Sequence, residues 1–304
     1  MQRRIHMTKL TIENVYTRHK AKELTKQHFW KLLGMMAIAF GIPFVLTTIT
    51  TAFFPTSDVS TYTLVMFLLM FVVQFLTIGL TLGMLRAFID LCRGKNDITV
   101  GSVFQHMPLC FKGFGLSLWV GLKTILWALP GYAAVFAAAF IMTHYVSTQG
   151  AVSEGTVALM TLLPVLAVII VFALVVPAAM RYMLSTYILA DKPDTGVFEC
   201  VRESKAMMKG HKWQAFKLAV PVILVMYVVF LVASVVISSA AAFVAANEAL
   251  ITAMGILMMI VLLVIVVYFN IRLYLCYCIF YLNRVKEMTP AEEPAEAPAE
   301  SPAE

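Results

Sequence analysis

The chain has 304 residues, of which 61% are apolar and only 13% are charged, whereas soluble domains have about 45–50% apolar and about 25% charged residues. A soluble fold cannot keep that much apolar surface from water, so the composition excludes a soluble domain and predicts a polytopic membrane protein. The formal charge is +6, although six of the 17 acidic residues lie from Glu287 onward. Basic residues gather beside the apolar runs, which indicates the positive-inside rule and not a nucleic-acid partner.

Residues 1–31 form a basic arm before the first apolar run. Ile12, Val15 and Tyr16 precede the stretch AKELTKQHFWK, in which Phe29 and Trp30 are adjacent aromatic residues. This pattern predicts an interfacial helix that ends with its aromatic residues at the level of the lipid headgroups. The first apolar run is too long for the core of a signal peptide, and we expect it to remain as a membrane anchor.

Six apolar runs follow the arm, and each meets the requirement of about 20 residues for crossing a ~30 Å hydrocarbon core. They make residues 32–286 an all-α bundle of six transmembrane helices. The runs are Leu32–Phe54, Tyr62–Leu85, Gly113–Met142, Thr156–Met180, Leu218–Ala246 and Leu250–Phe269.

The connectors between the runs predict the topology. Pro55–Thr61, Thr143–Gly155 and Asn247–Ala249 contain no Lys or Arg. The arm, the second and fourth connectors and the residues after the last run are all basic. Because Lys and Arg accumulate on the cytoplasmic side, we expect both termini in the cytoplasm.

The second connector carries an amphipathic helix near residues 98–108. Val100, Val103, Phe104 and Met107 stand at i, i+3, i+4 and i+7, the spacing of one helix face. Pro108 is expected to end or bend that helix.

The fourth connector contains the clearest surface helix, near residues 195–210. Val197, Val201, Ser204 and Met208 share one face, and charged residues occupy the others. We expect Asp194 or Thr195 to cap its start and Gly210 to close it. The basic arm and the two connector helices together are called the collar below.

The order of these segments predicts an internal repeat of three units, each an interfacial helix followed by two spans. His28, Cys110 and His211 take equivalent places before spans one, three and five. All three units have the same orientation, so the predicted relation is a parallel one about an axis along the membrane normal. Gly79 and Gly83 in span two have the spacing that allows close helix approach, and we expect them to pack inside the bundle.

Three arginines near the inner ends of spans two, four and six are candidates for anion binding: Arg86, Arg181 and Arg272. Arginine at this depth commonly snorkels to lipid phosphates and sets the depth of its helix. The alternative is a ring of three guanidinium groups that binds an anionic headgroup, an acidic peptide or a substrate carboxylate. Further candidates are Lys123, which lies deeper in span three, and Lys205, Lys209 and Lys212 in the fourth connector.

Catalytic, metal-binding and cofactor-binding motifs are lacking in the sequence, so we expect no enzyme and no cofactor. The five cysteines have no ligand spacing, and none lies in an outer connector, which makes disulfides improbable. Residues 287–304 form an acidic Pro/Ala/Glu tail, which regular prolines and repelling glutamates keep disordered.

The stretch from Tyr187 to Leu218 carries a resemblance to a known family. Its opening Ala-Asp-x-Pro-Asp-x-Gly begins at Ala190, and its core Ser-x-x-Met-Met-Lys-Gly-x-Lys-Trp begins at Ser204. Both resemble the signature of the bacterial integral-membrane proteins called domain of unknown function 975. The Gly-Trp and Pro-Tyr pairs usual in that family are missing here. The resemblance implies a bacterial plasma membrane and a multi-span bundle, and it brings no catalytic residues.

Two functions follow as hypotheses from these patterns. In the first, the collar engages anionic lipid of the inner leaflet or a membrane protein partner, without enzyme activity. In the second, the protein transports an amphipathic or anionic solute, with Arg86, Arg181 and Arg272 at its inner mouth. The sequence leaves open the substrate and the oligomeric state.

Overall fold

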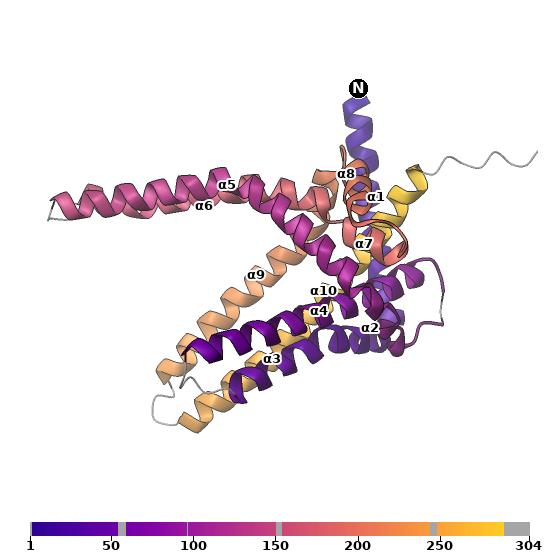
Figure 1. Cartoon of the computed structure of the whole chain (residues 1–304), viewed down its shortest axis with the longest axis horizontal. Helices are drawn as coiled ribbons and strands as arrows, with labels where there is room; N and C mark the ends of the chain where they lie inside the picture. The colour runs from indigo at the N-terminus through magenta and orange to yellow at the C-terminus, as the bar shows by residue number, and fades with distance from the viewer. Residues whose placement is uncertain (1, 54–58, 96, 150–153, 244–247, 289–304) are drawn as a thin grey trace, which may run out of the picture.

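The computed structural model describes residues 2–53, 59–95, 97–149, 154–243 and 248–288, and every regular element in these ranges is helical. Long helices meet at one end of the molecule and diverge toward the other (Figure 1). The long elements are α1 (Gln2–Gln27), α4 (Val59–Cys92), α5 (Cys110–Gln149), α6 (Glu154–Tyr182), α9 (Lys212–Phe243) and α10 (Glu248–Met288). The shorter ones are α2 (Phe29–Met36), η1 (Ala37–Gly41), α3 (Ile42–Phe53), η2 (Val100–Leu109), α7 (Ser185–Asp191) and α8 (Val197–Met207).

Six helical stretches of the described residues are long and apolar enough to cross a membrane, which are the properties of a multi-pass membrane protein. They coincide with the six predicted spans, and three antiparallel pairs result: α3 with α4, α5 with α6, and α9 with α10. Two helices continue beyond the inner ends of the predicted spans. Helix α4 continues past Arg86 to Cys92, and α10 continues past Arg272 to Met288.

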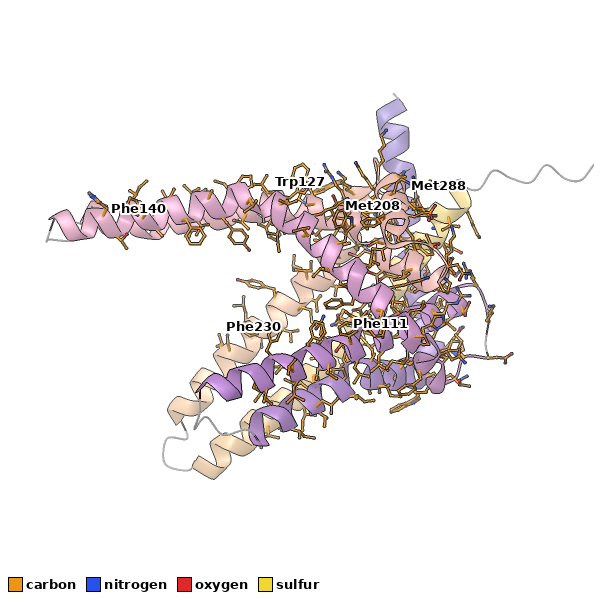
Figure 2. The ribbon with its side chains drawn as sticks, viewed as in Figure 1. Phe111, Trp127, Phe140, Met208, Phe230 and Met288 are labelled. Carbon is orange, nitrogen blue, oxygen red and sulfur yellow. The ribbon has the colours of Figure 1, made fainter. Side chains whose placement is uncertain are left out.

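The helix pairs diverge away from their common end, and the α5–α6 pair extends farthest from the others (Figure 1). Their outlying parts carry exposed apolar side chains such as Phe140 and Phe230 (Figure 2). In a bilayer this surface is covered by acyl chains, which solvate apolar side chains as well as a protein interior does.

The buried core lies where the helices meet, and we call this region the packed end. It consists of α2, η1, η2, α7, α8 and the adjoining parts of α1, α4, α5, α6, α9 and α10. Its largest fully buried side chains include Tyr281, Phe88 and Phe280. The packed end therefore holds the molecule together, because it alone brings all three helix pairs into contact with a shared set of buried residues.

Helix α8 is the predicted helix of the fourth connector, and its predicted face is buried. Of the four residues predicted for that face, Val201, Ser204 and Met208 are at most 3% exposed, and Val197 is half-buried against the same core. The cap prediction is wrong: the residue before the helix is Gly196, and no side chain caps it. Gly210 has φ +84°, a conformation that costs glycine little, and it stands between α8 and α9.

The helix of the second connector, η2, is a 3₁₀ helix that lies across α4. It contains Pro108 without interruption and leads directly into α5. A side chain at Gly83 would overlap the backbone carbonyl of Val103, and one at Gly79 would come within 2.8 Å of the Met107 sulfur. The two glycines therefore pack inside the molecule, as predicted, because their lack of a Cβ lets the η2 backbone approach α4.

Helix α1 contacts α9 and α10 through small polar residues. Asn14, Thr17, Ala21 and Thr25 are buried, whereas Val15 and Tyr16 are each 60% exposed. Val15 and Tyr16 therefore face away from the protein. An interfacial position for this helix stays a prediction, because the structure contains no membrane.

The three residues predicted to be equivalent all stand at junctions. His28 separates α1 from α2, Cys110 follows η2, and His211 precedes α9. The threefold repeat itself stays a prediction, and so do the domain boundaries at residues 31 and 287. The acidic tail from residue 289 lies outside the described residues.

Candidate anion-binding surface

A carboxylate that was not among the predicted site residues organises one side of the packed end. Asp191, the last residue of α7, has a side chain that is only 5% exposed. Arg86 donates to its Oδ1 at 2.6 Å, and Arg93 donates to Oδ1 and Oδ2, each at 2.6 Å. The hydroxyl of Tyr281 donates to Oδ2 at 3.0 Å. One carboxylate thus joins α4, the segment after it, α7 and α10.

A second acid, Asp90, belongs to the same ionic cluster as Asp191. Asp90 lies 3.4 Å from Arg86, as expected for an i, i+4 pair, and Lys95 lies 3.2 Å from Asp90. The hydrogen bond to Asp191 raises the pKa of the Arg93 guanidinium above its ordinary value, while burial acts in the opposite direction. Arg86 is therefore neutralised by two carboxylates and fixed in position, which leaves it little capacity for an external anion.

Another ionic cluster attaches α1 to the last two helices. Arg284, only 2% exposed, lies 2.7 Å from Glu13 and 2.6 Å from Glu287. Burial opposes the charge of Glu13, but hydrogen bonds from Gln214 and Arg284 outweigh it and lower the pKa of Glu13. His211 lies 3.0 Å from Arg284. The sequence did not predict this cluster, because Arg284 and Glu13 are 271 residues apart in the chain.

Arg181 is placed differently from Arg86. Its guanidinium stacks over the ring of Trp127 at 4.6 Å, a cation–π contact between α6 and α5. Its backbone carbonyl accepts a hydrogen bond from the Ser204 hydroxyl of α8 at 3.0 Å. Among the described residues, no carboxylate forms an ion pair with this guanidinium.

The fold brings two of the predicted lysines of the fourth connector to the end of α6 that carries Arg181. Lys205 follows Ser204, whose hydroxyl is bonded to Arg181, and Lys212 begins α9. Lys212 experiences electrostatic repulsion from both Arg181 and Lys205. Lys205 and Lys209 are exposed. None of the three lysines is ion-paired within the part of the chain that the structure describes.

Lys123 and Arg272 complete the predicted set. The Lys123 ammonium lies 5.0 Å from the ring of Trp119 and 5.8 Å from that of Tyr182, so it reaches back toward the packed end. Arg272 lies over Tyr268 at 5.9 Å, on α10. The structure therefore gives the three predicted arginines different partners, and it brings only Arg181 together with Lys205 and Lys212.

Exposed aromatic side chains accompany these cations. Phe198 of α8 and Trp213 of α9 are 68% and 64% exposed. Phe198 packs edge-on against Trp119 at 5.0 Å, and Lys217 lies over Trp213 at 5.9 Å. A basic surface with exposed aromatic rings suits the boundary between headgroups and acyl chains. We call Lys205, Lys209 and Lys212, with Phe198 and Trp213, the α8–α9 surface.

Catalysis by a nucleophilic side chain or by a bound metal ion has less support than anion binding. Within the described ranges, no three His, Cys, Asp or Glu side chains are placed to hold a metal ion. All five cysteines are free thiols, and burial raises the pKa of Cys200 to about 11, which keeps that thiol protonated and unreactive at neutral pH. What the described surface offers chemically is the binding of anions.

Comparison with known proteins finds a matching family. The family described as Protein of unknown function (DUF975) matches residues 12–223. No curated protein and no solved structure matches the chain. The matched range includes Arg86, Arg181, Asp191 and the whole α8–α9 surface, and it ends before α10.

Proposed function

The chain belongs to the DUF975 family of proteins of unknown function, and from this premise we propose that its collar engages anionic membrane lipid without enzyme activity. The observation that carries the proposal is the α8–α9 surface, where three lysines lack carboxylate partners among the described residues. Elsewhere at the packed end, basic residues such as Arg86, Arg93 and Arg284 are neutralised by acids.

The physical basis is the surface potential of a membrane that contains anionic lipid. Each Lys or Arg near such a surface contributes about 1 kcal/mol of attraction, and the effect falls off within a Debye length. Exposed Phe198 and Trp213 add apolar anchors beside the charges. The packed end then faces the cytoplasmic leaflet, with both termini in the cytoplasm, as the distribution of Lys and Arg predicts.

The transporter hypothesis is less well supported. It needs Arg86, Arg181 and Arg272 at one inner mouth, free to contact a solute. Arg86 is held by Asp191 and Asp90, so its charge is already compensated. The pairing pattern favours a lipid-facing surface on α8 and α9.

The test measures lipid selectivity in proteoliposomes. Spin-labelled anionic and zwitterionic phospholipids report, by electron paramagnetic resonance, which lipid is immobilised at the protein. We expect the protein to prefer the anionic lipid, and we expect neutralisation of Lys205, Lys209 and Lys212 to Gln to remove most of that preference. High salt should weaken it as well.

The matched control neutralises three basic residues that already have carboxylate partners: Lys95, Lys192 and Arg202 to Gln. Net charge changes equally in both variants. Equal loss of selectivity in the two would assign the effect to net charge alone, and unchanged selectivity in the first variant would refute the proposal. Circular dichroism and gel filtration confirm that both variants are folded.

A further inference from the structure

Arg181 near the end of α6, Lys205 of α8 and Lys212 at the start of α9 are cations that the fold brings to one junction of helices, and we call these three residues the cluster. The Ser204 hydroxyl holds α8 against the end of α6 through a 3.0 Å hydrogen bond to the Arg181 carbonyl. Helix α6 also contacts α8 and α9 directly. Burial and the positive charges of Arg181 and Lys205 lower the pKa of the Lys212 ammonium. The fold therefore gathers three like charges, an arrangement that is unfavourable until an anion joins it.

No described carboxylate forms an ion pair with any of these three residues. The neighbouring acids already have partners: Glu203 pairs with Lys192 at 3.0 Å, and Glu199 lies 3.4 Å from Arg202. Carboxylates therefore neutralise the adjacent basic residues Lys192 and Arg202 but not the three residues of the cluster. A guanidinium beside two ammonium groups matches phosphate oxygens in both charge and hydrogen-bond geometry.

The surroundings of the cluster suit a lipid better than a soluble anion. The Arg181 guanidinium lies over Trp127, an exposed ring on α5. Farther along their helices, α6 exposes Phe172 and α9 exposes Ile223 and Leu224. Acyl chains attached to a headgroup at the cluster would cover these apolar side chains. An ion without acyl chains would leave them uncovered.

We propose that Arg181, Lys205 and Lys212 form a discrete site for the headgroup of a phospholipid that carries two phosphate groups. Three cations against two phosphates leave a small net charge, whereas a single phosphodiester would leave two cations uncompensated. This inference rests on the proposed function, but it adds a defined stoichiometry of one lipid and a defined headgroup. Arg181 is its central residue, because a planar guanidinium can bind two phosphate oxygens at once.

The experiment counts retained lipids by native mass spectrometry on the full chain, titrated in detergent with cardiolipin or with phosphatidylglycerol. We expect one cardiolipin to be retained at low concentration, ahead of phosphatidylglycerol. Arg181→Gln should weaken that first binding step about tenfold, since hydrogen bonds between charged groups are the strong ones. Arg181→Lys should give an intermediate loss.

The matched control is Arg272→Gln, which removes the same charge from an arginine that also stacks on an aromatic ring. We expect it to bind cardiolipin as the unaltered protein does. Equal loss in both variants, or equal retention of the two lipids, overturns the inference. If pyrophosphate displaces the retained cardiolipin, the site binds a soluble phosphate compound, and the inference of a lipid site is overturned. If the unaltered protein selects anionic lipid in the spin-label experiment but retains no cardiolipin, this site alone is refuted. If it shows neither lipid selectivity nor a retained cardiolipin, the proposed function is refuted as well.

Discussion

Asp191 combines the three features that make a single residue structurally decisive. Its side chain is almost fully buried, it accepts hydrogen bonds from two guanidinium groups and a tyrosine, and it ends a helix. Burying an ionised carboxylate costs free energy unless opposite charges and hydrogen-bond donors surround it, and here the Arg86 and Arg93 guanidinium groups and the Tyr281 hydroxyl do so. The Asp191 cluster therefore stabilises the packed end and leaves Arg86 little capacity for an external anion.

Replacing Asp191 with Ala is expected to destabilise the protein markedly. Removing one partner from a buried ion pair costs about 3–5 kcal/mol, and we expect about 3 kcal/mol because Arg86 and Arg93 are partly exposed. Thermal unfolding in detergent, followed by circular dichroism, should show a clearly lower midpoint. The control is Asp194→Ala, which removes an exposed acid three residues away. Equal stability of the two variants would contradict the role assigned to Asp191.

Helix η2 and α4 illustrate how an element is placed by residues that lack side chains. The Val103 backbone approaches Gly83 so closely that no Cβ fits between them. Gly79 and Gly83 lie one turn apart on α4, so they form a continuous shallow surface for η2. The spacing of these two glycines predicted close helix packing, but it did not identify the element that packs against them. That partner is a 3₁₀ helix instead of a second span.

Gly83→Ala is expected to displace η2 from α4. An inserted methyl group in a well-packed site costs about 1–3 kcal/mol, and the upper part of that range applies because the obstacle is backbone. Limited proteolysis of the second connector and the thermal midpoint both report the change. Gly121→Ala is the control, since no atom lies within 4 Å of its added Cβ. That variant should be neutral or slightly stabilising, because Ala favours helix over Gly.

The whole molecule has its buried residues at one end and its membrane-spanning helices at the other. Spanning helices do not need a wide protein interface, because lipid solvates their apolar side chains. The packed end must satisfy charged and polar groups within the protein, so it contains the ionic clusters of Asp191 and Arg284. Any surface that binds an anion is consequently expected at this end.

The predicted topology can be tested by labelling single added cysteines in intact cells with an impermeant maleimide. A cysteine at Thr148, where α5 ends, should be labelled from outside. A cysteine at Lys95, at the packed end, should be labelled only after the membrane is permeabilised. The protein without an added cysteine is the control for its five native thiols. The reverse labelling pattern would invert the molecule and place the α8–α9 surface outside the cell.

The six spans, the buried face of α8 and the internal packing of Gly79 and Gly83 were all determined by the sequence. Each depends on residues within a few turns of one another, so length and periodicity are sufficient to predict it. Only the tertiary structure decided which charges remain free. Arg86 meets Asp191 across 105 residues, and Arg284 meets Glu13 across 271. Arg181 looked equivalent to Arg86 in the sequence, but its neighbours are Trp127 and two lysines. Tertiary packing decides which residues distant in the chain form ion pairs, and the local sequence carries no pattern from which those pairs can be predicted. The cations without an ion pair are those that packing places away from any acid.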